Sequence, residues 1–201
     1  MPNSKRDAVL GKMDRRTALA SLLLLLATRP SSAVSRSFDN PPVLETVRSQ
    51  FTMMAPPQKM PDVRLPLLNG KPGLLTARAG EILLLNIWAS WCVNCRDDLQ
   101  QLAELARQRR RGLSVQTVSV DTIEADRVRD FVDELQVGDL PIFLDRAGVL
   151  SGHAEGTQAL LPAFGMPITF LIRPDTIIAG YITGSPDWSS KAASDLISYY
   201  M

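Results

Sequence analysis

The chain has 201 residues, with 22 basic and 21 acidic residues and a net charge of +1. This length suits one domain with a leader or tail, and the near-neutral charge gives no overall case for nucleic-acid binding. One histidine, His153, and two cysteines, Cys92 and Cys95, exclude a four-ligand Cys/His zinc site. A scaffold of several disulfides is excluded as well.

Residues 1–33 have the features of a secretory signal peptide. Basic residues precede an apolar run from Ala18 to Ala27, and Ser31-Ser32-Ala33 places small residues around a cleavage point. The run is too short to span a bilayer comfortably, which takes about 20 residues. We therefore expect an exported protein, with an uncleaved N-terminal anchor as the alternative to cleavage. Arg15-Arg16 form a partial twin-arginine motif, so the export route stays open.

The charge of the chain changes when this leader is set aside. It contains six of the 22 basic residues and two of the 21 acidic ones, so the remainder has a net charge of −3. A mildly acidic domain has no electrostatic case for binding nucleic acid or anionic lipid.

Residues 34–60 show little periodicity and contain Pro41-Pro42 and Pro56-Pro57. This composition predicts a linker or a loosely packed arm, with a short helix over residues 43–51. The arm also carries a methionine cluster: Met53, Met54 and Met60. Thioether sulfur is a ligand for Cu(I), although adaptable apolar packing is the plainer interpretation of these side chains.

Residues 61–201 alternate between strand and helix patterns. Ile82–Trp88 is a continuous apolar run, as in a strand buried on both faces. The other expected elements are a hairpin at Asn69-Gly70, a helix over 95–110, strands over 114–120 and 141–144, a helix capped by Asp121, a strand pair over 169–172 and 178–183, and a closing helix through Tyr200. This order predicts a layered α/β domain with a mixed central sheet flanked by helices.

The two cysteines lie at the junction between the buried strand and the following helix. Cys92 comes just before that helix, whose free N–H groups and positive dipole end favour a thiolate. Cys95 is one turn further on, so it can attack a mixed disulfide formed at Cys92. We therefore predict a redox-active dithiol, with Cys92 as nucleophile and Cys95 as resolving thiol. Half a zinc site, a stabilising disulfide and a pair of inert cysteines are the alternatives.

A second motif, Gly165-Met166-Pro167-Ile168-Thr169, immediately precedes a predicted strand. Proline is tolerated at the first residue of a strand but not within a central one. A cis Met166–Pro167 bond would leave the preceding backbone free to pair with an extended substrate segment. An ordinary proline at a strand entry is the alternative.

Together, Ile87-Trp88-Ala89-Ser90-Trp91-Cys92-x-x-Cys95 and Gly165-Met166-Pro167-x-Thr169 resemble the exported TlpA/ResA-like thiol–disulfide oxidoreductases of the thioredoxin superfamily. The resemblance covers about residues 61–200 and includes Gly184-x-x-x-Trp188. It implies a periplasmic enzyme with a thioredoxin-like domain over 61–201, an N-terminal extension and no separate cofactor or metal. The implied clients are apocytochrome c or copper-assembly proteins of cytochrome oxidase, with electrons supplied by a membrane thiol reductase of the DsbD/CcdA type.

Three positions depart from the patterns of these families. Asn94 replaces the usual proline before the second cysteine, a position that influences the reduction potential. Asp98 takes the place of a buried glutamate, and as a helical i+3 neighbour of Cys95 it is a candidate proton relay. Its alternative is a solvated helix acid. Asn86 stands where cytoplasmic thioredoxins have a buried aspartate.

Trp91, Met166 and Pro167 are the predicted client-binding residues around Cys92. A thiol oxidant that uses the same dithiol remains open, because sequence does not set the direction of electron flow. A non-enzymatic Cu(I) carrier is a third hypothesis. A peroxidase is disfavoured, because peroxidases of this fold resemble Pro-x-x-x-Thr/Ser-x-x-Cys and the residue seven before Cys92 is Leu85. His153 is interpreted as a loop residue.

Overall fold

The computed structural model of the protein describes residues 39–152, 158–161 and 165–201. Asn40–Met201 form one compact unit. The predicted signal peptide and His153 therefore lie outside the described residues. Within the described part of the chain, no helix has the length and apolar character needed to cross a membrane.

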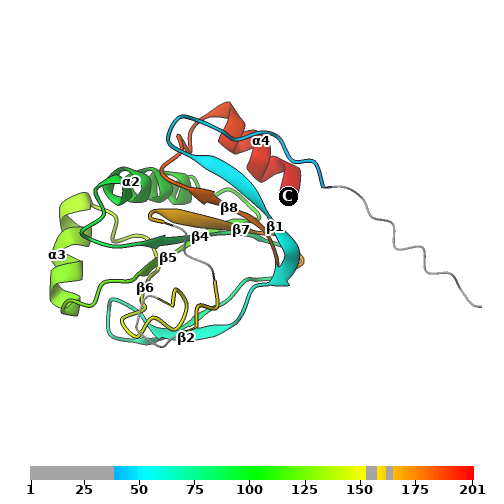
Figure 1. Ribbon diagram of the computed structural model, residues 1–201. Coiled ribbons are helices and arrows are strands. Elements are labelled where there is room, and N and C mark those ends of the chain that lie inside the picture. Colours follow the sequence, from blue (N-terminus) through cyan, green and yellow to red (C-terminus); the bar gives the residue numbers. More distant parts are fainter. Residues whose placement is uncertain (1–38, 153–157, 162–164) are drawn as a thin grey trace, which may run out of the picture. The chain divides into compact units, whose positions relative to one another are not determined.

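A six-stranded mixed sheet forms the centre of the Asn40–Met201 unit (Figure 1). Strand β4 pairs in parallel with β5 and antiparallel with β7, which makes the sheet mixed as predicted. The strand order is β1-β8-β7-β4-β5-β6. Their bounds are β1 Gln50–Lys59, β4 Ile82–Trp88, β5 Leu113–Ser119, β6 Ile142–Leu144, β7 Ile168–Ile172 and β8 Ile177–Thr183.

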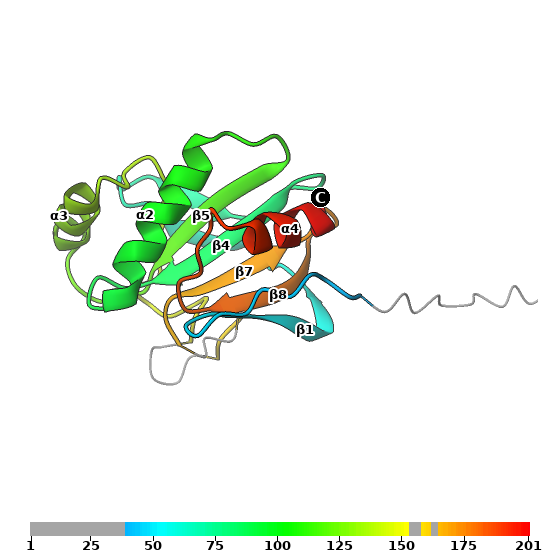
Figure 2. The same ribbon diagram turned by 90° about the horizontal axis from the view of Figure 1, so that it is seen from above.

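Helices and a small hairpin cover this sheet. Helices α2 (Val93–Arg107) and α4 (Lys191–Tyr200) lie over the same face of the sheet, and α3 (Ala125–Leu135) lies beside α2 (Figures 1 and 2). The predicted hairpin is formed by β2 (Val63–Pro66) and β3 (Pro72–Leu75), and Leu67 after β2 forms a bridge with Phe143 of β6. This arrangement confirms the predicted thioredoxin-like α/β fold.

The core is built around β4, whose seven residues are all buried. An unbroken apolar strand needs cover on both faces. Side chains alternate between those faces, so Asn86, between Leu85 and Ile87, points to the side on which α2 lies. The fold thus places one polar side chain from the central strand beneath the helix that follows the cysteines.

Residues 50–59 differ from their prediction. They do not form a loosely packed arm or the end of a short helix, because Gln50–Lys59 pair with β8 as the edge strand β1. Leu44 and Met60, on either side of β1, are buried in the core. Pro56-Pro57 lie where the register with β8 shifts, between Met53 and Gln58. Edge strands and bulges tolerate proline, because the ladder loses few N–H donors there.

The helix predicted to be capped by Asp121 begins later than expected. Its N-terminal cap is Glu124, and α3 runs from Ala125 to Leu135. Asp121 is buried, and its carboxylate accepts hydrogen bonds from the backbone N–H and hydroxyl of Ser90 and from the hydroxyl of Ser119. Asp121 therefore holds the loop before the cysteines and does not cap the helix.

Candidate active site

Cys92 and Cys95 form a disulfide at the start of α2, with their Cα atoms 5.3 Å apart. Cys92 is the N-terminal cap residue of the helix and is 8% exposed, whereas Cys95 is fully buried. In the dithiol state, a thiolate on Cys92 faces the free N–H groups and positive dipole end of α2. Cys92 thus lies nearer to solvent than Cys95, which is enclosed.

The loop before Cys92 is held at both ends. The N–H of Cys92 donates to the carbonyl oxygen of Ala89 (3.1 Å). Ser90 donates to Asp121 through its N–H (2.9 Å) and its hydroxyl (2.7 Å). These bonds fix the position of Cys92 relative to the end of β5, where Asp121 follows.

Asp98 lies on α2 one turn after Cys95, and it is fully buried. Its Oδ1 accepts a hydrogen bond from Nε1 of Trp188 (2.8 Å), and its Oδ2 accepts one from Nδ2 of Asn86 (2.7 Å). Burial raises the pKa of Asp98 from 3.8 to about 7, although these hydrogen bonds favour the ionised form. A pKa near neutrality suits a group that accepts and returns a proton.

Asn86 links this carboxyl to the strand beside it. Its Nδ2 donates to Asp98 and also to the hydroxyl of Thr169 on β7 (2.9 Å). Its Oδ1 is buried and has no partner in the described structure. The amide therefore has an unused acceptor next to a titratable group.

Trp188 is attached to α2 at two points. Its indole donates to Asp98, and its backbone N–H donates to Oε1 of Gln101 (3.0 Å). The segment between β8 and α4 thereby covers the buried carboxylate.

The Gly165–Thr169 motif lies at the same end of the central strands as the cysteines. Ile87 of β4 pairs with Ile168 of β7, so the end of one strand adjoins the start of the other. The Met166–Pro167 peptide bond is cis. Pro167 is buried, Met166 is half-buried, and Gly165 is exposed. The carbonyl oxygen of Pro167 accepts a hydrogen bond from the N–H of Gly184 (2.9 Å).

The tryptophans next to the cysteines have different environments. Trp91 is 67% exposed, which is unusual for so large an apolar side chain. Trp88 is fully buried and stacks on Phe131 of α3, with ring centroids 5.5 Å apart. Only Trp91 of this pair is therefore available to a docking protein.

The three methionines considered for copper do not share one exposed surface. Met60 is buried in the core, at 4% exposure. Met53 and Met54 are neighbours on β1, so their side chains point to opposite faces of the strand. Among the described residues, no group of three or more His, Cys, Asp and Glu side chains is arranged to hold a metal. Nothing in this arrangement favours the Cu(I) carrier.

Sequence reasoning identified Cys92, Cys95 and Asp98, and the structure brings all three to the first two turns of α2. It missed that Asn86 and Trp188 bond Asp98. The signal for Asn86 was a lone polar residue inside an apolar strand, and a buried polar group needs a partner. The signal for Trp188 was weaker, because the indole reaches Asp98 across 90 residues of sequence.

Comparison with known proteins agrees with this geometry. The AhpC/TSA family model matches residues 56–181. The thiol:disulfide interchange protein DsbE of Vibrio cholerae is 30% identical over 164 residues, which cover 80% of this chain and 79% of that protein. The thioredoxin-like protein YneN of Bacillus subtilis is 32% identical over 94 residues, which cover 46% of this chain and only 55% of that protein.

A solved structure shares the fold. The crystal structure of a putative thiol:disulfide interchange protein DsbE from Chlorobium tepidum has a TM-score of 0.57 and 23% identity, and the match covers 71% of this chain and 96% of that one. The site and these matches define a thioredoxin-fold redox enzyme. The chain belongs to the AhpC/TSA family and within it to the TlpA/ResA-like thiol–disulfide oxidoreductases.

Proposed function

We propose that the protein is a periplasmic reductase that transfers electrons from the Cys92/Cys95 dithiol to disulfides of client proteins. The clients are apocytochrome c or proteins that assemble the copper centre of cytochrome oxidase, and a membrane reductase of the DsbD/CcdA type restores the dithiol. The observation that carries this proposal is the unequal burial of the two cysteine residues at one helix N-terminus, with Cys92 8% exposed and Cys95 fully buried.

The reaction has two exchange steps. The Cys92 thiolate attacks one sulfur of a client disulfide, which forms a mixed disulfide and releases the other client sulfur as a thiolate. Cys95 then loses its proton to the Asp98 carboxylate and attacks Sγ of Cys92. The Cys92–Cys95 disulfide forms, and the second client sulfur leaves as a thiolate. Two electrons have then passed from the dithiol to the client.

Asp98 is the proposed proton acceptor for Cys95. It lies at i+3 on the same helix, so the two side chains share a face, and both are fully buried. With a pKa of about 7, the carboxyl is part ionised at neutral pH. It can therefore take the proton of the thiol in one direction and return it in the other.

The proposed docking surface is formed by Trp91, Met166 and Pro167. Trp91 supplies an exposed aromatic face next to Cys92. The β7 ladder begins at Ile168, so the backbone of Gly165 and Met166 lies before the paired residues. An extended client segment can add its own hydrogen bonds there.

Trapping tests this function. Cys95→Ser leaves the nucleophile but removes the resolving thiol, so it should accumulate a mixed disulfide with oxidised apocytochrome c or with an oxidised copper-assembly protein. Cys92→Ser, the matched control, should trap neither. The wild-type protein in dithiol form should reduce the same client catalytically. A Cys95→Ser protein that traps neither client, under conditions where its Cys92 reacts with a small disulfide, would contradict the proposed clients.

A further inference from the structure

The carboxyl of Asp98 faces two hydrogen-bond donors. The indole N–H of Trp188 donates to its Oδ1 (2.8 Å), and the Nδ2 group of Asn86 donates to its Oδ2 (2.7 Å). Both contacts suit an ionised carboxylate, which only accepts hydrogen bonds. A neutral carboxyl also carries an O–H donor, and neither of these contacts offers it an acceptor. The protonated Asp98 of the proposed exchange reaction therefore needs a different arrangement of its neighbours.

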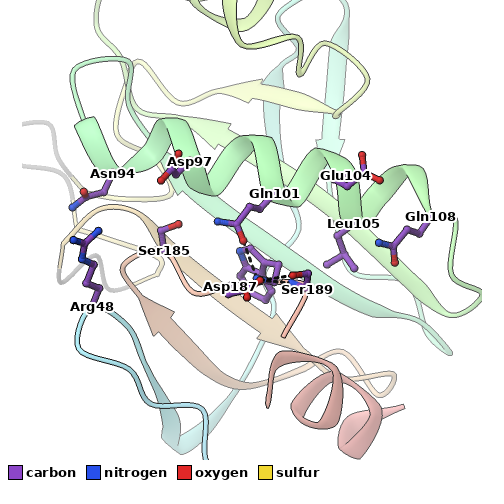
Figure 3. A pocket seen from close by; sticks show the side chains of 11 residues that line it. Arg48, Asn94, Asp97, Gln101, Glu104, Leu105, Gln108, Ser185, Asp187 and Ser189 are labelled. Carbon is purple, nitrogen blue, oxygen red and sulfur yellow. Dashed lines mark hydrogen bonds between the residues drawn. The ribbon is translucent and has the colours of Figure 1, made fainter. Parts of the chain in front are cut away.

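An open groove runs along α2, but Asp98 does not line it. The groove has a volume of about 550 Å³, and its lining includes Asp97, Gln101 and Trp188. Figure 3 shows α2 on one side of the groove and the segment after β8 on the other. Asp98 and Asn86 are fully buried and are not among the lining residues. A buried side chain is therefore better placed than groove water to accept the Asp98 O–H.

Asn86 carries the acceptor that the neutral carboxyl needs. Its Oδ1 is buried and has no hydrogen-bond partner in the described part of the chain. A half-turn of the amide about its Cβ–Cγ bond exchanges Oδ1 with Nδ2, so that Oδ1 faces Asp98. The Thr169 hydroxyl accepts from Nδ2 at 2.9 Å, and because a hydroxyl also donates, it can bond Oδ1 after the turn. From this geometry we infer that Asn86 is a positioning residue whose amide turns over with the Asp98 proton: Nδ2 holds the carboxylate, and Oδ1 holds the neutral acid.

The two orientations of the amide leave different atoms without a partner. With Nδ2 facing a neutral Asp98, both the Asn86 carbonyl oxygen and the acid O–H lack one. After the half-turn, Nδ2 stands where Oδ1 stood, while the acid O–H and the Thr169 hydroxyl both donate to Oδ1. A carboxylic O–H is a stronger donor than an amide N–H, so the turned amide costs less with the neutral acid. With the carboxylate the order reverses, because Oδ1 would then face another acceptor.

The turn breaks no covalent bond and moves no electrons. After Cys95 has given its proton to Asp98, the proton resides on Oδ2, because the indole N–H that faces Oδ1 cannot accept it. Oδ1 of Asn86 accepts this O–H until the proton leaves. When the disulfide is reduced, Asp98 returns a proton to Cys95, and Nδ2 turns back to the carboxylate. Asn86 thus keeps Asp98 bonded in both protonation states.

Charged side chains on α2 and on the segment before α4 belong to the surroundings of this pair. Asp97 raises the pKa of Asp98 through its charge, and Asp187 lines the same groove as Asp97. Strands β4 and β7 contribute the uncharged side chains of Asn86 and Thr169. The two cysteines do not titrate in the disulfide form. Titration of that form therefore reads Asp98 without a contribution from the thiols.

Nuclear magnetic resonance of the full chain in the disulfide form tests the turn directly. The carbon-13 shift of the Asp98 carboxyl gives its titration midpoint, and the Overhauser effect between the Asn86 Nδ2 protons and the Thr169 side chain reports the orientation of the amide. This effect should be strong above the midpoint and should fall several-fold below it. Gln116 is the matched control, because its Oε1 is also buried and unpartnered in the described structure, but its Nε2 donates to the backbone carbonyl of Thr76 (3.3 Å) rather than to a carboxyl. Its amide should keep one orientation throughout.

Asn86→Leu provides a second measurement. The variant keeps the size of the side chain and removes both its donor and its acceptor. Because the amide holds both forms of Asp98, both forms should lose a comparable contact, and the midpoint should move by less than about half a pH unit. An amide that acted only as a donor would hold the carboxylate alone, and its loss would raise the midpoint by about one pH unit or more.

Two results would overturn the inference: a constant Overhauser effect across the wild-type titration, or a rise of the midpoint by more than about half a pH unit in Asn86→Leu. If Asn86→Leu does not fold, the wild-type measurement alone decides. The inference rests on the proposed role of Asp98 in the exchange reaction. Failure of that role would appear separately, as unchanged thiol exchange kinetics in Asp98→Asn.

Discussion

The stability of the disulfide form should depend on pH through Asp98, and Asp98→Asn should remove that dependence. Folding raises the pKa of this carboxyl from 3.8 to about 7. Between these values the unfolded chain is ionised while the folded protein holds the proton. The free energy of unfolding therefore falls as pH rises, by about 1.4 kcal/mol per pH unit from this group. From pH 5 to pH 7 the loss is about 2 kcal/mol, because the carboxyl in the folded protein is already half ionised at pH 7. The contribution of this group levels off by about pH 8, where the carboxyl is ionised in both states.

The structure accommodates the substitution. The indole of Trp188 can still donate to the oxygen of the introduced amide. Asn86 can rotate its own amide and offer the unpartnered Oδ1 to the new N–H donors. Asp98→Asn should therefore fold and keep the Cys92–Cys95 disulfide.

Urea unfolding of both proteins at pH 5, 6, 7 and 8 measures this effect. Other titrating groups contribute equally to both, so the difference between the two unfolding free energies isolates Asp98. The variant should become more stable relative to wild type as pH rises from 5 to 7, and the difference should level off by pH 8. A difference that does not change with pH would show that the charge of Asp98 is not suppressed by burial, and the proton-relay argument would fail.

Two further substitutions test the surroundings of the site. Trp188→Phe removes the indole donor to Asp98, so the pKa of Asp98 should rise further above about 7 and the fall in stability should continue to higher pH in the same urea assay. Gly184→Ala should lower the unfolding free energy by more than about 1 kcal/mol, because φ is +77° and a Cβ would lie 1.9 Å from the carbonyl oxygen of Arg48. Gly80→Ala is the control, because φ is +86° there and an added Cβ would have no neighbour within 4 Å. It should lower the unfolding free energy by less than Gly184→Ala does, and the difference between the two variants measures the effect of the clash with Arg48.

The parts of the fold that depend on local pattern were predictable. Ile82–Trp88 was expected as a doubly buried strand and is β4 with the same bounds. The position of the cysteines at a strand-to-helix junction followed from that strand and the periodicity of α2. The final strand pair and helix were predicted as well, because their apolar spacing and the turn at Arg173–Thr176 are local features.

The parts that depend on distant partners were not predictable. Strand β1 has mostly exposed side chains and two prolines, so its sequence carries no strand period, and only its pairing with β8 makes it a strand. Asp121 is a residue type that often caps helices, but its carboxylate oxygens accept hydrogen bonds from the hydroxyls of Ser90 and Ser119 instead. Whether Asp98 was solvated or buried could not be read from α2 alone, because Trp188 and Asn86 enclose it from other elements.

The central claim is that the Cys92/Cys95 pair works as a reductant, and its equilibrium reduction potential tests this most directly. The purified protein is equilibrated with glutathione or with a thioredoxin of known potential, and the fraction in dithiol form is measured by thiol alkylation. The account predicts a potential near or below about −250 mV, in the range of thioredoxin. A potential near about −120 mV, the range of a strong thiol oxidant, would contradict it and would assign the dithiol to disulfide formation instead.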